Sequence, residues 1–339
     1  FLGACGRLNL VPPQVERLLE LLGPVVRQRG DAGHLTALAQ LAAKFGLAGH
    51  AEAEAVLGAV CTRFEAQSRA LLPPAQAGGA PGDLRRIASQ PRGYASQVVY
   101  GQLLLALVFD EAASEVRDRA LAAAVAAVHG SFGCALAALD ERLARQLQVA
   151  ELACRLERPG AASLLEARGL LAFLGEVRDL QSGQALPAAP LTKVSSQQHL
   201  QVSGALQALG ITHRLEERLL PYVADVRLMR GESRLIEIDG PLHFVGGSGR
   251  YDMKSVLKHR LLTKQGWHVH HIAWHDWPAQ HHSRLNYLAR LLRSAAPGRV
   301  MHEYMPAEQL EPSAAALGPG GDISKGIDSS AAVPSDMSE

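Results

Sequence analysis

The stretch LIEIDGPLHF, residues 235–244, decides the fold of the second half of this chain. Its first residues form a short apolar run typical of a buried strand, which Gly240-Pro241 ends. Side chains alternate between the two faces of a strand, so Glu237 and Asp239 project from the same face. Two carboxylates on an apolar strand are costly unless a metal ion, a base or a hydrogen-bond donor meets them. The stretch therefore predicts a metal-dependent nuclease site or a rigid polar anchor at a strand end.

The segments around this strand predict further helices and strands in a fixed order. In chain order the expected elements are a helix at 195–209, a strand at 225–228, the acidic strand, a basic helix at 251–265, a strand at 267–274, a turn at 275–278 and a final helix. Asp225 begins the first of these strands, and Gly266 ends the basic helix. This order predicts a small α/β domain.

These residues and their order resemble the RAP domain, an RNA-binding module of organelle-targeted proteins. The resemblance extends over about residues 191–293, and five ordered pieces carry it: SSQQHLQVSGALQALG, DVRL, IEIDGPLHF, VLKHRLLTKQGWHV and HDW. It implies a restriction-endonuclease-like α/β fold. It also implies RNA binding in organellar RNA processing, stability or translation, in the mitochondrial matrix or alternatively the chloroplast stroma.

The same resemblance extends to nucleases of the PD-(D/E)XK type and raises the alternative of an endoribonuclease. In that comparison Asp225 corresponds to the first acid and Glu237 to the second, while Asp239 stands where a lysine is common. The three carboxylates would then be catalytic and would hold Mg²⁺ or Mn²⁺. The missing lysine favours binding without cleavage, for which no cofactor is required.

Basic side chains of the predicted helix are candidate phosphate contacts. Lys254 and Lys258 lie one helical turn apart on one face, where they can hold phosphates or reach back to the acids. Arg260 belongs to a second pair, with Lys264, on another face of the helix. We include Arg260 among the RNA-binding candidates, although a solvated surface position is the favoured explanation of that pair.

Histidine and tryptophan side chains supply the other candidates. His243 follows the acids and can contact phosphate, transfer a proton or cap the turn. Trp277 lies in the predicted turn, where an indole can stack on a base, whereas Trp267 and Trp274 are expected in the core. Two alternating histidines, His268 and His270, form a weaker candidate for a transition-metal pair.

Composition limits the function classes. The 339 residues carry a net charge of +1, but residues 211–300 hold 14 Lys and Arg against 8 Asp and Glu, a mild positive field. The four cysteines have no metal-ligand spacing and are expected to be reduced and buried. No apolar run approaches the ~20 residues of a membrane span, so no membrane insertion is expected. Because the chain begins at Phe1, we expect a fragment or a mature form whose targeting peptide is not visible.

Residues 1–180 predict an α-helical domain, with apolar positions at three- and four-residue spacing. Residues 34–72 have the length of one helical hairpin, and residues 102–128 are a candidate second copy. This region resembles octotricopeptide-repeat and FAST-kinase-like proteins, which implies RNA-reading repeats; a scaffold that docks on other ribonucleoprotein components is the alternative. Residues 181–193 predict a linker and hinge, residues 194–300 the RAP domain, and residues 311–339 a disordered tail.

Overall fold

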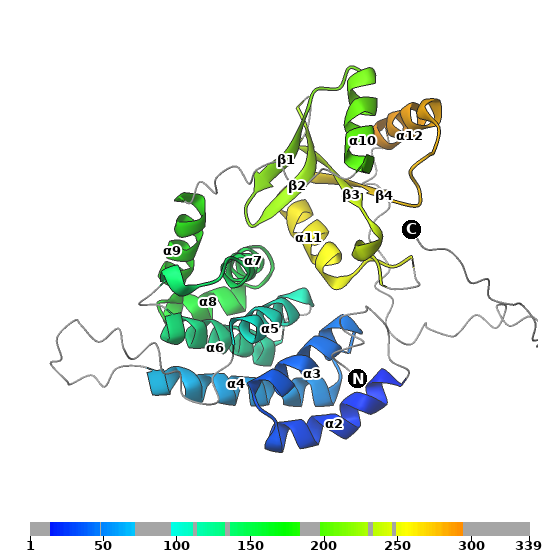
Figure 1. Cartoon of the computed structure of the whole chain (residues 1–339). Helices are drawn as coiled ribbons and strands as arrows, with labels where there is room; N and C mark the ends of the chain where they lie inside the picture. The colour runs from blue at the N-terminus through cyan, green and yellow to red at the C-terminus, as the bar shows by residue number, and fades with distance from the viewer. Residues whose placement is uncertain are drawn as a thin grey trace, which may run out of the picture.

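The computed structural model of the protein shows a helical half followed by an α/β half (Figure 1). The structure describes residues 14–47, 49–71, 96–110, 114–132, 136–183, 197–229, 233–245 and 249–293. The first half comprises α2 (Val15–Arg29), α3 (Ala32–Lys44), α4 (Ala51–Leu71), α5 (Gln97–Phe109), α6 (Glu115–Phe132), the 3-10 turn η2 (Leu136–Ala138), α7 (Glu141–Glu157), α8 (Pro159–Ala167) and α9 (Leu170–Gly183). The second half comprises α10 (Gln197–Ala208), β1 (His213–Leu219), β2 (Tyr222–Leu228), β3 (Arg234–Asp239), the 3-10 turn η3 (Pro241–His243), α11 (Met253–Lys264), β4 (His268–Ala273) and α12 (His281–Arg293).

Local signals explain where several helices begin and end. Asp31, Asp140 and Asp252 each accept a hydrogen bond from the backbone amide three residues later, which satisfies one free donor at the start of α3, α7 and α11. Gly266 follows α11 with a φ of 90°, a left-handed conformation that favours glycine. These boundaries are therefore properties of the nearby sequence.

The helices of the first half stack in two layers. In one layer α3 contacts α5, α5 contacts α7 and α7 contacts α9; in the other α2 contacts α4, α4 contacts α6 and α6 contacts α8. Successive helical hairpins therefore lie against each other, as in a stacked repeat array. The proposed units at 34–72 and 102–128 correspond to the neighbouring pairs α3–α4 and α5–α6, so this half is consistent with the repeat description.

The second half is built on a four-stranded sheet in the order β1-β2-β3-β4. The pairs β1–β2 and β2–β3 are antiparallel, whereas β3 and β4 are parallel and are connected through α11. Ile236 and Ile238 of β3 join the cluster formed with α10 and α12, while Leu235 joins Leu262 of α11. The sheet is therefore covered on both faces, which explains why every residue of β3 and β4 after the first is buried, acids and histidines included.

Helix α11 joins the two halves, because it packs on α5 and α7 as well as on the sheet (Figure 1). Leu257 and Leu261 of α11 are buried in the same apolar cluster as the helices of the first half. The contact therefore extends the helical core into the α/β half. The hinge predicted at 181–193 would leave the two halves independent, whereas the structure shows a buried contact between them. Residues 184–193 themselves lie outside the described residues.

A buried ion pair lies in this contact. The Arg260 guanidinium donates to the Glu157 carboxylate at 2.9 and 3.1 Å and to the backbone oxygens of Phe109 and Val108 at 2.5 and 2.8 Å. Those two carbonyls end α5, where no helical amide can reach them. Lys264 approaches the same Glu157 carboxylate at 3.2 Å. Arg260 is thus engaged in holding the halves together, and the structure does not present it to RNA.

The structure confirms most expected elements of the second half and adds one. Strand β1 was not anticipated, because its residues HRLEERL are polar and largely exposed at the sheet edge.

Of the four cysteines, Cys61 and Cys154 are free and buried as expected, and burial raises the pKa of the Cys61 thiol to about 11. The other two, and the tail at 311–339, lie outside the described residues. No helix in the described ranges has the length and apolar character needed to cross a bilayer.

Candidate functional site

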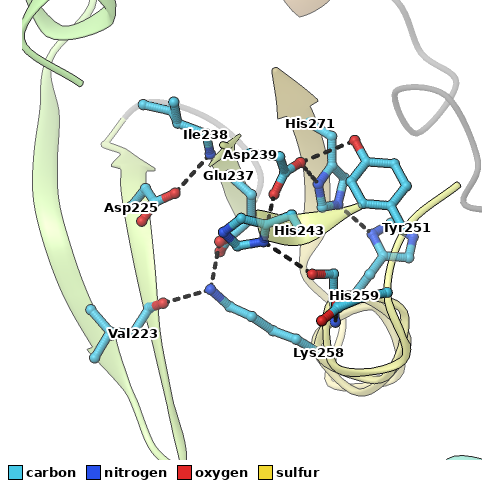
Figure 2. A network of polar contacts seen from close by, with 12 residues as sticks. Val223, Asp225, Glu237, Ile238, Asp239, His243, Tyr251, Lys258, His259 and His271 are labelled. Atoms are coloured by element: carbon cyan, nitrogen blue, oxygen red, sulfur yellow. Dashed lines mark hydrogen bonds and ion pairs between the residues drawn. The ribbon is translucent and has the colours of Figure 1, made fainter. Parts of the chain in front are cut away.

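The three predicted acids lie close together on neighbouring strands, and each has a separate set of partners (Figure 2). Glu237 and Asp239 share one face of β3, as the alternation predicted, and this face lies toward α11 and the segment before it. Both side chains are almost completely buried. Buried carboxylates need donors close by, so the partners decide what each acid does.

Asp225 on β2 takes the place of a backbone acceptor. The β2–β3 ladder pairs Val226 with Ile236, and beyond this pair the Asp225 carboxylate accepts the Ile238 amide at 2.7 Å. His199 of α10 approaches the same oxygen at 3.6 Å. Burial acts to raise the pKa of Asp225, but the hydrogen bonds from His199 and from the Ile238 amide outweigh it and lower the pKa. Asp225 is therefore an ionised link between two strands and a helix.

Glu237 on β3 is paired with Lys258 of α11. The Lys258 ammonium donates to Glu237 at 2.5 Å and to the backbone oxygen of Val223 on β2 at 2.8 Å. One helix lysine thus reaches back to the acids, as the sequence indicated, and bridges two strands where their ladder has ended (Figure 2). The second Glu237 oxygen is buried and has no hydrogen-bond partner among the described residues. Burial raises the pKa of Glu237 to about 7, against the opposing attraction of Lys258.

Asp239 at the end of β3 is the centre of a histidine and tyrosine network. One carboxylate oxygen contacts His271 Nδ1 at 2.6 Å and accepts from the Tyr251 hydroxyl at 3.0 Å, and the other lies 3.4 Å from His243 Nδ1. His271 Nε2 continues the network to His259 Nδ1 at 2.9 Å. The network ties β3, β4 and α11 together around one buried carboxyl group (Figure 2).

Sequence reasoning missed Tyr251, His259 and His271 as members of this network. A signal was present for His271, because it follows His268 and His270 on the opposite face of the same strand. The parallel register places His271 beside Glu237 and Ala273 beside Asp239. Tyr251 and His259 carry no such signal, since their positions depend on how α11 packs.

These residues do not fit the divalent metal centre of the endoribonuclease alternative. Within the described ranges, no three His, Cys, Asp or Glu side chains form a group able to hold a metal ion. Asp225, Glu237 and Asp239 instead direct their oxygens to an amide, an ammonium and a cluster of ring donors. The arrangement is that of the rigid polar anchor, the second interpretation of the acidic strand.

The weaker metal candidate, His268 with His270, lies side by side on the other face of β4, with ring centres 4.8 Å apart. His270 is fully buried, and neither of its ring nitrogens has a hydrogen-bond partner among the described residues. Burial lowers the pKa of His270 to about 4, so the ring is neutral near pH 7. The pair therefore consists of one buried and one partly buried imidazole, with no third ligand among the residues that the structure describes.

The environments of Trp274 and Trp277 are the reverse of those predicted. Trp277 is partly buried against the core of the second half, and its indole N–H donates to Gln201 at 3.0 Å. Trp274, expected in the core, is 50% exposed immediately after β4. The physical reason is that β4, in which every residue after His268 is buried, ends at Ala273, so Trp274 lies beyond the covered part of the strand. Trp274 is the indole available for stacking.

A row of aromatic rings supports Trp274 at the edge where β3 and β4 end. Phe244 lies 4.6 Å from Tyr251 and 5.4 Å from His275, and His275 lies 5.5 Å from Trp274, all between ring centres. Leu242, after β3, is 87% exposed on the same edge. The innermost ring, Tyr251, is hydrogen-bonded to Asp239, so the buried network fixes the row that ends in an exposed indole.

Of the remaining predicted RNA contacts, Lys254 and His243 are accessible. Lys254 is exposed in the first turn of α11, and His243 is half-exposed with its Nδ1 3.0 Å from the Ser255 hydroxyl. Lys258, by contrast, is held by Glu237. Residues 246–248, between η3 and α11, lie outside the described residues.

A comparison with protein families identifies the module that carries this site. Residues 236–291 match the family model of the RAP domain, from β3 through most of α12. The second half of the chain therefore contains a RAP domain, and the match indicates an RNA-binding role. The matched residues include Glu237, Asp239, the aromatic row and α11, whereas Asp225 precedes them.

Proposed function

We propose that this protein binds single-stranded RNA through the edge of the sheet at which β3 and β4 end. The exposed Trp274 indole carries this proposal, because a flat aromatic surface held rigid at an edge offers a base a stacking platform. The carboxyl ends of adjacent parallel strands are a common place for ligands in α/β sheets. His243, half-exposed near the same edge, is a donor for a phosphate or a base.

RNA binding of this kind supports a role in organellar RNA processing, stability or translation. The support is the RAP domain match, together with stacked helical hairpins that resemble RNA-reading repeats. We place the protein in the mitochondrial matrix, with the chloroplast stroma as the alternative. Imaging the tagged full-length gene product beside organelle markers tests this location, and a cytosolic signal contradicts it.

The first test of RNA binding replaces Trp274. Trp274→Ala is expected to weaken binding of single-stranded RNA by roughly 5- to 150-fold, because stacking of one base on an aromatic ring contributes about 1–3 kcal/mol. Trp274→Phe, which keeps a ring, is expected to retain most of the affinity. Fluorescence anisotropy with a labelled oligonucleotide measures both, and circular dichroism checks that each variant is folded.

A matched control variant and an incubation with Mn²⁺ complete this experiment. Leu215→Ala removes a part-exposed apolar side chain from β1, away from the edge, and is expected to leave affinity unchanged. Equal binding by the wild type, Trp274→Ala and Trp274→Phe contradicts the stacking site. The same RNA is also incubated with Mn²⁺, and cleavage that Glu237→Gln or Asp239→Asn abolishes would restore the endoribonuclease alternative.

A further inference from the structure

The contact between the two halves leaves a cleft of about 590 Å³ beside α11. One wall comes from α5 and α7, through Leu105, Arg142, Arg145 and Val149; the other comes from the RAP-domain half, through Tyr222, Lys254 and Leu257. This volume lies within the range of small-ligand sites, ~300–1,000 Å³. Neither half forms the cleft alone.

The charge of the cleft favours an anionic occupant. Within the described part of the chain, neither Arg142 nor Lys254 has an acidic partner, and both are exposed on opposite walls. The acids nearby are already engaged: Glu141 pairs with Arg145 at 2.6 Å, and Asp140 accepts the Leu143 amide at 2.6 Å. Two cations facing one cleft lower the free energy of a phosphate between them.

Between the charged groups, both walls of the cleft are largely apolar. Leu105, Val149 and Leu257 line the cleft, so bases can rest against apolar side chains while their phosphates meet the cations. The Tyr222 hydroxyl, in the wall of the cleft, is buried and has no hydrogen-bond partner among the described residues. An occupant with apolar faces, polar edges and regular negative charge matches this lining, and single-stranded RNA has all three.

The first turn of α11 lies between the cleft and the edge that carries Trp274, because it holds Lys254 of the cleft and Ser255, a partner of His243. Lys254 precedes Ser255, and the Ser255 hydroxyl lies 3.0 Å from His243, which follows β3 at that edge. An RNA strand stacked on Trp274 would pass His243 and the first turn of α11 before it reached the cleft. Cations of the helical half and of the RAP-domain half would contact one continuous RNA.

We propose that single-stranded RNA passes from the Trp274 edge into this cleft, where Lys254 of the RAP domain and Arg142 of the helical half hold successive phosphates. The proposal rests on the RNA binding proposed above and adds that binding needs both halves. It also gives the helical half a direct phosphate contact, in addition to any base reading by its repeats.

The test compares charge removal in the cleft with charge removal elsewhere. Arg142→Ala with Lys254→Ala is expected to lower affinity for a single-stranded RNA of about twelve nucleotides by roughly tenfold or more, and to flatten the slope of log affinity against log salt by about 1.4, that is ~0.7 per lost contact. The matched control is Arg290→Ala with Arg293→Ala, two exposed arginines of α12 on the other face of the sheet. The control is expected to retain the wild-type slope.

The outcomes separate this proposal from the one on which it rests. If the wild-type protein binds no RNA at low salt, the proposed RNA-binding function itself is wrong. If Trp274→Ala weakens binding while the cleft variant matches the wild type in affinity and salt slope, RNA uses the edge and not the cleft. An equal loss in the cleft variant and the α12 control also overturns the proposal, since the effect is then one of net charge.

Discussion

Glu157→Gln is expected to lower the free energy of unfolding by about 3–5 kcal/mol, because it leaves the Arg260 guanidinium buried without its carboxylate. The Glu157 side chain is 1% exposed and that of Arg260 is 11% exposed, so water replaces the lost partner poorly. Urea denaturation followed by circular dichroism measures the loss. Glu141→Gln is the matched control, because its partner Arg145 and Glu141 itself are more than half exposed. An exposed pair of this kind contributes about 0–1 kcal/mol.

The same substitution tests whether the two halves form one unit. A protease recognition sequence inserted between residues 185 and 190 allows the chain to be cut after folding. The wild-type fragments are expected to remain together on size-exclusion chromatography, because Leu257 and Leu261 share a core with the helical half. The Glu157→Gln fragments are expected to separate at lower concentrations of urea. Wild-type fragments that separate in buffer alone would show that the halves are independent.

The second large effect concerns two buried groups that titrate in opposite directions. The pKa of Glu237 is raised from 4.5 to about 7, so its contribution to stability is present below pH 4.5 and lost as the pH rises toward 7. The pKa of His270 is lowered from 6.5 to about 4, so its contribution is present above pH 6.5 and lost as the pH falls toward 4. In the wild-type protein the two dependences oppose each other.

Single substitutions should separate these dependences. Relative to the wild type, Glu237→Gln is expected to gain stability between pH 4.5 and 7, and His270→Leu is expected to gain stability as the pH falls from 6.5 to 4. Each change is on the order of 3 kcal/mol over its window. Unfolding by urea at half-unit pH intervals measures both curves. His281→Leu, on the exposed start of α12, is the control for His270; curves parallel to the wild type would contradict the assignment.

Short-range patterns in the sequence determined the local structure of the RAP-domain half. The alternation in residues 235–239 placed Glu237 and Asp239 on one face, and Gly266 ended α11 where it was expected. Capping and alternation act over a few residues, so the sequence alone carries them. The edge strand β1 was not predicted, because its exposed positions have no apolar pattern.

Only the tertiary structure decided what the site residues do. Lys258 holds Glu237 and Val223, whereas Arg260, two positions later, holds Glu157 from the other half of the chain. Both are basic residues of one helix, and only the packing of α11 between the sheet and α7 distinguishes them. Likewise, Trp274 is exposed because β4 ends one residue before it, and Trp277 is covered because α12 returns over it. Helix faces and strand ends of this kind are fixed by contacts between segments far apart in the chain, which no local pattern encodes.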